Sequence, residues 1–265
     1  MNRSIFEKIQ ESAKILNIDL YAAELAGYTM EQEFSREMLE AIEKVFSHLR
    51  KKKEESIVTT LLRMSRLPLK EPKTFEGFDF NHVHGKNIDA LRNLPTLSAL
   101  YAHRNLAFIG PQGVGKTHLA MAYGRECCKR GMKTYFLKAT ELNQRMSDAR
   151  RFGREGNMIL SLVKPTCLII DEVGRCVFDR ENTRMFFDLI DRRYNKDGPN
   201  TMIFTSNKSP DKWDEFFSED SSLLCALDRI FDDAMVFMMK GASYRGRKLE
   251  TIAIETGSRR ATKEQ

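Results

Sequence analysis

A glycine-rich octapeptide near the middle of the chain constrains the fold more than any other feature. It fits the pattern G-x-x-x-x-G-K-[ST], and its residues are Gly110, Pro111, Gln112, Gly113, Val114, Gly115, Lys116 and Thr117. An apolar run, 106–109, precedes it, and a helical stretch, 118–130, follows it. Glycines allow backbone N–H groups to surround phosphate oxygens, and the beginning of a helix adds partial positive charge. The octapeptide therefore predicts a strand, a phosphate-binding loop and a helix, in that order.

The last two residues of this loop have separate roles in binding a nucleoside triphosphate. Lys116 is long enough to reach the β- and γ-phosphates, and the hydroxyl of Thr117 can ligate Mg²⁺. We therefore expect the cofactors of this loop to be ATP and Mg²⁺.

Two adjacent carboxylates, Asp171 and Glu172, follow the apolar run 167–170. If that run is a buried strand, both carboxylates lie at the carboxyl edge of a sheet, where ligands bind in open α/β folds. We expect Asp171 to hold Mg²⁺ and Glu172 to polarise the attacking water. A kinase must keep water away from the γ-phosphate, whereas a carboxylate beside the magnesium ligand suits water activation. The pair therefore favours ATP hydrolysis.

Short apolar runs alternate with helical stretches from residue 105 onward. The apolar runs are 106–109, 134–137, 167–170, 202–205 and 235–238, and the helical stretches between them include 118–130 and 181–194. Strands that alternate with helices are typical of a parallel sheet covered on both faces. The sequence therefore predicts an α/β fold with a parallel five-stranded sheet flanked by helices.

The N-terminal part of the chain shows a helical pattern instead. Apolar residues recur at steps of three and four along 34–49, and no Gly or Pro interrupts 32–67, so one long amphipathic helix is expected. Gly27 is expected to end a shorter helix before it, and Pro68 and Pro72 break the pattern after it. We expect a helical N-terminal domain at 1–70 that binds DNA or a partner, a linker at 68–79, a nucleotide-binding domain at 71–256 and a basic tail at 257–265.

Composition argues against several other classes of protein. The chain has 265 residues and a formal net charge of +6, and it contains no run of 18 apolar residues that could cross a membrane. Its N-terminus lacks the apolar core of a signal peptide, so a cytoplasmic location is expected. The five cysteines are odd in number and include no Cys-x-x-Cys pair, which argues against a disulfide framework or a zinc site.

The order and spacing of further motifs resemble the IstB-like family, a branch of the AAA+ ATPases related to DnaC-type helicase loaders. The motifs are 110–119, 168–174, 186–194, 205–207 followed by Trp213, 227–230 and 241–245. The resemblance implies an AAA+ P-loop core at 71–256. It also implies a protein that binds ATP, self-associates into a ring or spiral on double-stranded DNA and presents target DNA to a transposase.

The same resemblance implies roles for three residues outside the loop. Asn207 matches the sensor-1 position and would contact the γ-phosphate or the attacking water. Arg229 matches the arginine finger and would reach the γ-phosphate of a neighbouring subunit. Arg245 belongs to a Ser-Tyr-Arg motif and would act as a second phosphate sensor in its own subunit. The chain departs from many relatives at Arg175, where they carry a tyrosine after the glycine.

Three basic clusters are candidates for contacting DNA. They are 50–53 in the N-terminal helix, Arg145 with Arg150, Arg151 and Arg154, and a tail cluster at 259–263. By resemblance, the middle cluster faces the central channel of DNA-encircling AAA+ proteins. We expect Arg150, Arg151 and Arg154 to contact phosphates, which gives salt-dependent binding with little sequence preference.

These observations predict an ATP-dependent helper of insertion-sequence transposition in which hydrolysis releases DNA. One alternative is a DnaC-like replicative helicase loader, which acts on a ring helicase and single-stranded DNA. The core motifs do not distinguish such a loader from a transposition helper. A second alternative, from another class, is an ATP-binding adaptor with little hydrolysis. The presence of Glu172 argues against the adaptor.

Overall fold

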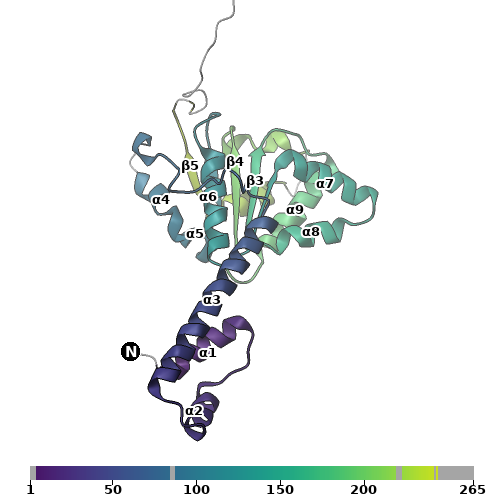
Figure 1. Cartoon of the computed structure of the whole chain (residues 1–265). Coiled ribbons are helices and arrows are strands. Elements are labelled where there is room, and N and C mark those ends of the chain that lie inside the picture. Colours follow the sequence, from purple (N-terminus) through teal and green to yellow (C-terminus); the bar gives the residue numbers. More distant parts are fainter. Residues whose placement is uncertain (1–3, 84–86, 219–222, 242, 244–265) are drawn as a thin grey trace, which may run out of the picture.

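The computed structural model describes residues 4–83, 87–218, 223–241 and 243. An elongated, helical N-terminal part leads into an α/β part that contains the octapeptide (Figure 1). Within those ranges, no helix is both long and apolar enough to span a lipid bilayer.

One sheet of parallel strands forms the centre of the α/β part. The strands are β1 Leu106–Ile109, β2 Thr134–Lys138, β3 Cys167–Val173, β4 Thr201–Ser206 and β5 Met235–Met238. Their order in space is β2-β3-β4-β1-β5, and every neighbouring pair is parallel. The predicted parallel five-stranded sheet is therefore confirmed. The strand β3 continues to Val173, so it includes both Asp171 and Glu172.

Helices cover both faces of this sheet because its central strands are apolar on both sides. On β3, Leu168 and Ile170 pack into one core cluster, whereas Cys167 and Ile169 pack into the other. The first cluster includes residues of α7 Ala139–Arg151, α8 Glu155–Val163, α9 Arg180–Tyr194 and α10 Leu223–Phe231. The second includes residues of α4 Ile88–Arg92, α5 Ser98–Tyr101 and α6 Lys116–Lys129. Short 3₁₀ turns lie at Phe80–His82, Leu94–Thr96, Pro210–Lys212 and Asp214–Phe216.

The N-terminal part contains three helices, α1 Ile5–Leu16, α2 Ala22–Glu31 and α3 Arg36–Met64. The expectation that Gly27 ends a helix is wrong, because α2 continues through it to Glu31. The residue that adopts the left-handed conformation after α2 is Glu33, with φ of 54°, and the N–H of Phe34 closes the end by donating to the carbonyl of Thr29 at 2.9 Å. A glycine inside a helix costs only about 1 kcal/mol, so it does not stop the helix by itself.

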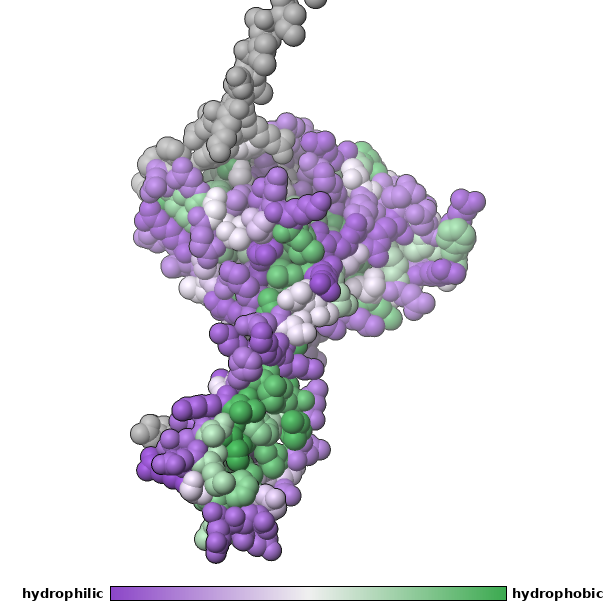
Figure 2. Space-filling model, in the orientation of Figure 1, coloured by the Kyte–Doolittle hydropathy of each residue, from purple (hydrophilic) through white to green (hydrophobic). Residues whose placement is uncertain are grey.

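The long helix α3 joins the two parts of the molecule. Its beginning packs on α1, while Met38, Val45 and Leu49 on its expected apolar stripe remain 45–57% exposed. Figure 2 shows the resulting apolar area on the N-terminal part. The end of α3 packs on α6 and β2, and the carbonyl of Ser65 accepts a hydrogen bond from the N–H of Phe136 at 2.9 Å.

The segment at 68–79 is attached to the α/β part rather than free of it. Phe75 and Phe78 are buried in the core cluster on the α6 face of the sheet. Just before this segment, Arg66 pairs with Glu141 of α7. The N-terminal part is thus fixed to the α/β part from Leu61 onward, where α3 first becomes buried.

Candidate active site

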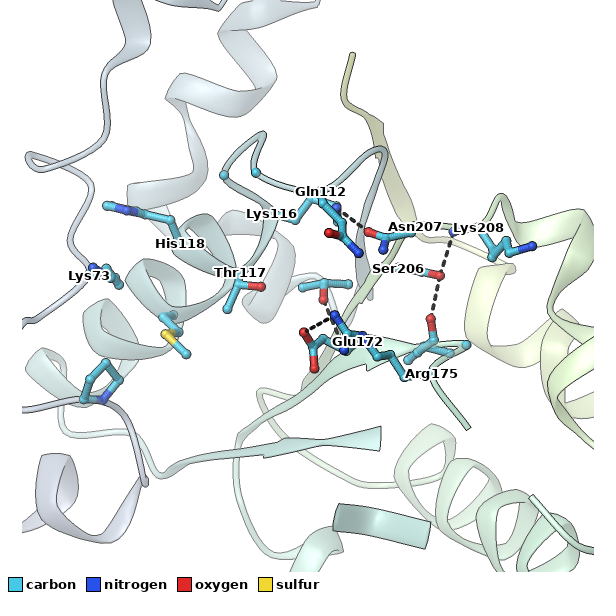
Figure 3. Close-up of a pocket in the computed structure, with 17 residues that line it drawn as sticks. Lys73, Gln112, Lys116, Thr117, His118, Glu172, Arg175, Ser206, Asn207 and Lys208 are labelled. Carbon is cyan, nitrogen blue, oxygen red and sulfur yellow. Dashed lines mark hydrogen bonds and ion pairs between the residues drawn. The ribbon is translucent and has the colours of Figure 1, made fainter. Parts of the chain in front are cut away.

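The glycine-rich loop lies between β1 and α6 at the carboxyl edge of the sheet, as its sequence predicts. A pocket of about 650 Å³ opens beside it, and the loop residues face the ends of β3 and β4 across this pocket (Figure 3). Gly115 has φ of 99°, and a Cβ atom at this position would lie 2.7 Å from the ring of Phe78. A side chain there is therefore excluded both by backbone conformation and by space.

Lys116 is surrounded by oxygen acceptors at the base of this loop. Its Nζ donates to the carbonyls of Gly110 and Pro111, both at 2.6 Å, and to Oδ1 of Asn207 at 2.8 Å. The side chain of Lys116 is buried, and it lines the pocket. The structure thus brings together Lys116 and Asn207, two of the residues expected from the sequence, from the loop and from the end of β4.

Asp171 is the centre of a hydroxyl and carboxylate network. Its Oδ1 accepts hydrogen bonds from the hydroxyl of Thr117 at 2.8 Å and from the hydroxyl of Thr205 at 2.6 Å. The carboxylate is only 2% exposed, and no described lysine or arginine pairs with it. Mg²⁺ prefers oxygen ligands, and the carboxylate of Asp171 and the hydroxyl of Thr117 in the phosphate loop are two such ligands side by side. The residues present therefore fit a magnesium ion.

Thr205 was not among the residues expected from the sequence. Its hydroxyl donates to Asp171 and accepts a hydrogen bond from the backbone N–H of Glu172 at 3.0 Å, so it links the two acidic residues. The signal available was its place in the polar triplet that ends β4, next to Asn207. A threonine in a buried strand is otherwise ordinary, because β-branched residues favour strands.

Glu172 has a backbone conformation that is rare outside glycine. Its φ is 60°, and the pairing of β3 with β4 shifts register between Ile170 and Val173. The carboxylate forms ion pairs with Lys138, at 3.1 Å from Oε2, and with Arg175, at 3.4 Å from Oε1. Figure 3 shows Glu172 beside Arg175 at the pocket. An unusual backbone at this position fixes where the carboxylate of Glu172 lies.

The remaining polar residues make the pocket basic. Lys73, Arg175 and Lys208 line it together with Lys116, whereas the only carboxylate among the described lining residues is that of Glu172. His118 also lines it, and its Nε2 lies 2.7 Å from the carbonyl of Thr74, to which it donates. Burial lowers the pKa of His118, and the charge of Lys73 lowers it further. Such an excess of positive charge suits a polyphosphate ligand.

Comparison with known proteins places the chain in a family. The family model described as IstB-like ATP binding protein matches residues 12–251. The chain belongs to this family. One relative, the ATP-binding protein of insertion sequence IS5376 from Geobacillus stearothermophilus, is 38% identical over 191 residues, which are 72% of this chain and 74% of that protein. Another, from insertion sequence IS232 of Bacillus thuringiensis subsp. berliner, is 30% identical over 235 residues, 89% and 91% of the two chains.

Solved structures share the fold of this IstB-like protein. DnaI matches with a TM-score of 0.54 and 20% identity over 69% of this chain and 93% of DnaI. AMPPCP-bound DnaA from Aquifex aeolicus matches with a TM-score of 0.51 and 22% identity over 66% of this chain and 51% of DnaA. This likeness confirms the fold expected from the sequence, a parallel sheet with flanking helices around a P-loop.

Arg229 lies on α10 and does not line the pocket of its own chain. Its guanidinium pairs with Asp191 of α9 at 2.9 Å and lies 5.9 Å from the ring centroid of Tyr194. The side chain is 42% exposed, so the pair is open to solvent.

Arg245 and the basic tail, 257–265, lie outside the described residues of this IstB-like protein.

The arginines expected to contact DNA occupy the end of a helical hairpin formed by α7 and α8 (Figure 1). We call residues 150–154 the hairpin tip. Arg150 forms two hydrogen bonds with Asp179, at 3.1 and 2.9 Å, so it faces the beginning of α9. Arg151 and Arg154 instead lie over the ring of Phe152, at 5.6 and 6.0 Å from its centroid. Phe152 is 63% exposed, which the sequence pattern alone did not indicate.

Proposed function

We propose that this IstB-like protein is a magnesium-dependent ATPase that acts as a DNA-binding helper of insertion-sequence transposition. The observation that carries the proposal is the convergence of Thr117, Asp171, Thr205 and Glu172 at the edge of the pocket. The relatives named above belong to insertion sequences, which supports the biological setting.

The side chains divide the chemistry among them. Thr117 and Asp171 would hold Mg²⁺, which supplies positive charge to the β- and γ-phosphates. Thr205 fixes the orientation of Asp171 by its hydrogen bond. Lys116 would exchange its carbonyl acceptors for phosphate oxygens, because hydrogen bonds between charged groups are stronger. Asn207, held against Lys116, would contact the γ-phosphate or the attacking water.

Glu172 would orient the water that attacks the γ-phosphate and would accept its proton. Arg229 would complete the site of a neighbouring subunit, because it lies away from the pocket of its own chain and is exposed. In this arrangement a ring or spiral of subunits is needed for full activity, and Arg229 must leave Asp191 to reach its neighbour. Arg245 would be a second phosphate sensor.

Duplex DNA would be held at the hairpin tip. Arg151 and Arg154 would contact phosphates, and the exposed ring of Phe152, over which both guanidinium groups lie, would insert as an apolar wedge between base pairs. Arg150 contributes less, because Asp179 already accepts both of its hydrogen bonds. The N-terminal domain, 1–70, would contact DNA or the transposase, and the exposed apolar residues of α3 favour a protein partner.

The ATPase proposal is tested by Glu172→Gln, with Glu181→Gln as a control at an exposed carboxylate outside the pocket. The first variant should lose ATP turnover by roughly 100-fold or more, because a general base contributes on the order of 10²–10⁴ in rate. It should still bind ATP and should stay assembled on duplex DNA, as seen by electron microscopy. If Glu172→Gln matched the wild type in both turnover and assembly, the result would instead favour an ATP-binding adaptor.

The DNA proposal is tested at the hairpin tip with fluorescent duplex and single-stranded DNA over a range of salt concentrations. Phe152→Ala should weaken duplex binding roughly tenfold, since one stacked base is worth about 1–3 kcal/mol. Arg151→Ala and Arg154→Ala should each lower the salt dependence by about one phosphate contact, and Arg150→Ala should not. Equal effects at all three arginines would contradict the assignment, and preference for single-stranded DNA would favour a helicase loader.

A further inference from the structure

The guanidinium of Arg229 lies against two side chains of the last turn of α9. Asp191 pairs with it at 2.9 Å, and the guanidinium carbon lies over the ring of Tyr194, 5.9 Å from the ring centroid. We call Asp191 and Tyr194 the α9 cradle. The two residues are three apart in the helix, so their side chains lie on the same face of α9. A charged partner and an aromatic partner therefore act on one guanidinium.

The core fixes the position of the α9 cradle relative to α10. On α9, Leu189 and Ile190 are fully buried, and on α10, Ala226 and Ile230 are each only 1% exposed. All four belong to the core cluster on one face of the sheet, and the two helices are in direct contact. Arg229 therefore changes partners by moving its side chain rather than its helix.

Tyr194 is itself anchored at its hydroxyl. Its Oη donates to Oδ2 of Asp232, which follows α10, at 3.3 Å. The helix backbone and this hydrogen bond hold the ring at both ends, although the side chain is 52% exposed. A cation is attracted to the face of an aromatic ring, so a ring held in this way limits the directions that the guanidinium can take. Tyr194 thus restricts Arg229 within its own subunit.

The two parts of the α9 cradle differ in whether a phosphate can replace them. The carboxylate of Asp191 is an anion, and a phosphate oxygen is the same kind of partner for a guanidinium. The side chain of Asp191 is 45% exposed, and an ion pair so open to solvent is weak. The ring of Tyr194 carries no charge and does not compete with phosphate. Its contact with Arg229 can therefore persist while the anion is exchanged.

We propose that Tyr194 is a positioning residue that orients Arg229 toward the nucleotide of a neighbouring subunit, and that the γ-phosphate of that nucleotide displaces Asp191. This inference rests on the proposed function, in which Arg229 completes the neighbouring site. Loss of the ring should slow hydrolysis, because a disordered guanidinium must then be ordered during docking. Loss of the charge of Asp191 should favour docking, because the competing ion pair is removed.

The first test compares two tyrosines of similar exposure. Tyr194→Leu should lower ATP turnover by about twofold to fivefold, as expected for the loss of an exposed cation–π contact. Tyr194→Phe, which keeps the ring, should restore the wild-type rate. The control is Tyr101→Leu, because Tyr101 is 53% exposed and lies on α5, on the other face of the sheet. The KM for ATP should stay within about twofold of wild type, because Arg229 does not line the pocket of its own chain.

The second test removes the competing anion. Asp191→Asn should lower the protein concentration that gives half-maximal turnover by about twofold to fivefold. Asp188→Asn should not, although this carboxylate lies on the preceding turn of α9 and also pairs with an arginine, Arg192. The variants of Asp191 and Tyr194 thus change activity in opposite directions, which a loss of stability in both would not do. An unchanged or higher half-maximal concentration in Asp191→Asn would overturn the displacement of Asp191.

Mixed oligomers show whether Tyr194 acts across the boundary between subunits. Glu172→Gln subunits supply Arg229 but no working site, and Arg229→Ala subunits supply a working site without the arginine, so mixing them should restore turnover. Tyr194→Leu added to the Glu172→Gln subunits should lower the restored turnover by about twofold to fivefold. Added to the Arg229→Ala subunits, it should leave the restored turnover unchanged. Equal losses in the two mixtures would show a merely structural role of Tyr194 and would overturn the proposal.

The inference and the proposed function fail in different ways. If Arg229→Ala alone keeps the wild-type turnover, Arg229 completes no neighbouring site and the proposed function is wrong at that point. If Arg229→Ala is slow while folded Tyr194→Leu keeps the wild-type turnover, Arg229 retains its role and only the positioning by Tyr194 is wrong.

Discussion

Two basic side chains are ringed by oxygen acceptors at opposite edges of the same sheet. At the carboxyl edge, Nζ of Lys116 donates to two carbonyls of the phosphate loop and to Asn207. At the amino edge, the guanidinium of Arg193 donates to the amide oxygen of Asn200 and to the carbonyls of Leu162, Val163, Pro165, Thr166 and Thr201. The chemistry is similar, but only the first set of acceptors faces a pocket.

The difference lies in what can replace each cation's partners. Arg193 is fully buried, and burial lowers its pKa to about 10. Its acceptors come from the end of α8, from the loop before β3 and from the end of the loop before β4 together with the first residue of β4, so Arg193, which lies on α9, holds these elements together. Lys116 is open to solvent and ligand on one side, so phosphate or water can take the place of its carbonyl acceptors. One edge is therefore built for stability and the other for exchange of ligands.

The largest effect should come from exchanging the two cations for alanine. Arg193→Ala leaves several buried carbonyls unpaired and should lower the free energy of unfolding by about 4 kcal/mol. Lys116→Ala should change that free energy by no more than about 1 kcal/mol, because water can reach the freed acceptors. It should instead reduce ATP turnover by roughly 100-fold or more, since it removes a charge from the phosphate site. Urea unfolding and steady-state turnover measure the two quantities.

Lysine and arginine swaps provide the matched controls for this pair. Arg193→Lys retains the charge but has too few donors for the six acceptors, so its loss of stability should be intermediate. If Arg193→Ala were as stable as wild type, or if Lys116→Ala were the less stable of the two, the contrast between the edges would be wrong.

The same contrast explains which features the sequence could predict. The phosphate loop and the five strands follow from local patterns, because glycine positions and apolar runs dictate them. That Asn207 shares a site with Lys116 was expected only from the resemblance to AAA+ ATPases. The network at Arg193 was not predictable, since its acceptors come from positions up to 31 residues away along the chain. The exposure of the α3 stripe was missed for a similar reason: periodicity shows which face is apolar but not what covers it.

Within the candidate site, the features that could not be predicted from the sequence are backbone geometry and ion pairs between residues far apart in the chain. The adjacent Asp171 and Glu172 were visible in the sequence, but the positive φ of Glu172 and its pairs with Lys138 and Arg175 were not. Likewise, the pairing of Arg150 with Asp179 joins residues 29 apart, so no local pattern separates Arg150 from Arg151 and Arg154. A cluster of like charges in sequence is thus divided by contacts that only the fold provides.

Substitution of one buried polar side chain at each edge, Thr205 at the carboxyl edge and Asn200 at the amino edge, should have smaller effects on stability and turnover. Thr205→Val removes the hydroxyl that bonds Asp171 and the N–H of Glu172, and Asn200→Ala removes the amide that bonds Arg193. Each variant should lose about 1–2 kcal/mol of unfolding free energy, because each leaves buried partners unpaired. Only Thr205→Val should also lose turnover, by roughly tenfold, since a hydrogen bond to a charged group is worth about 1.5–3 kcal/mol. Equal turnover in the two variants would show that Thr205 supports the fold alone, and the carboxyl edge would then depend on Lys116, Thr117 and Asp171 for its chemistry.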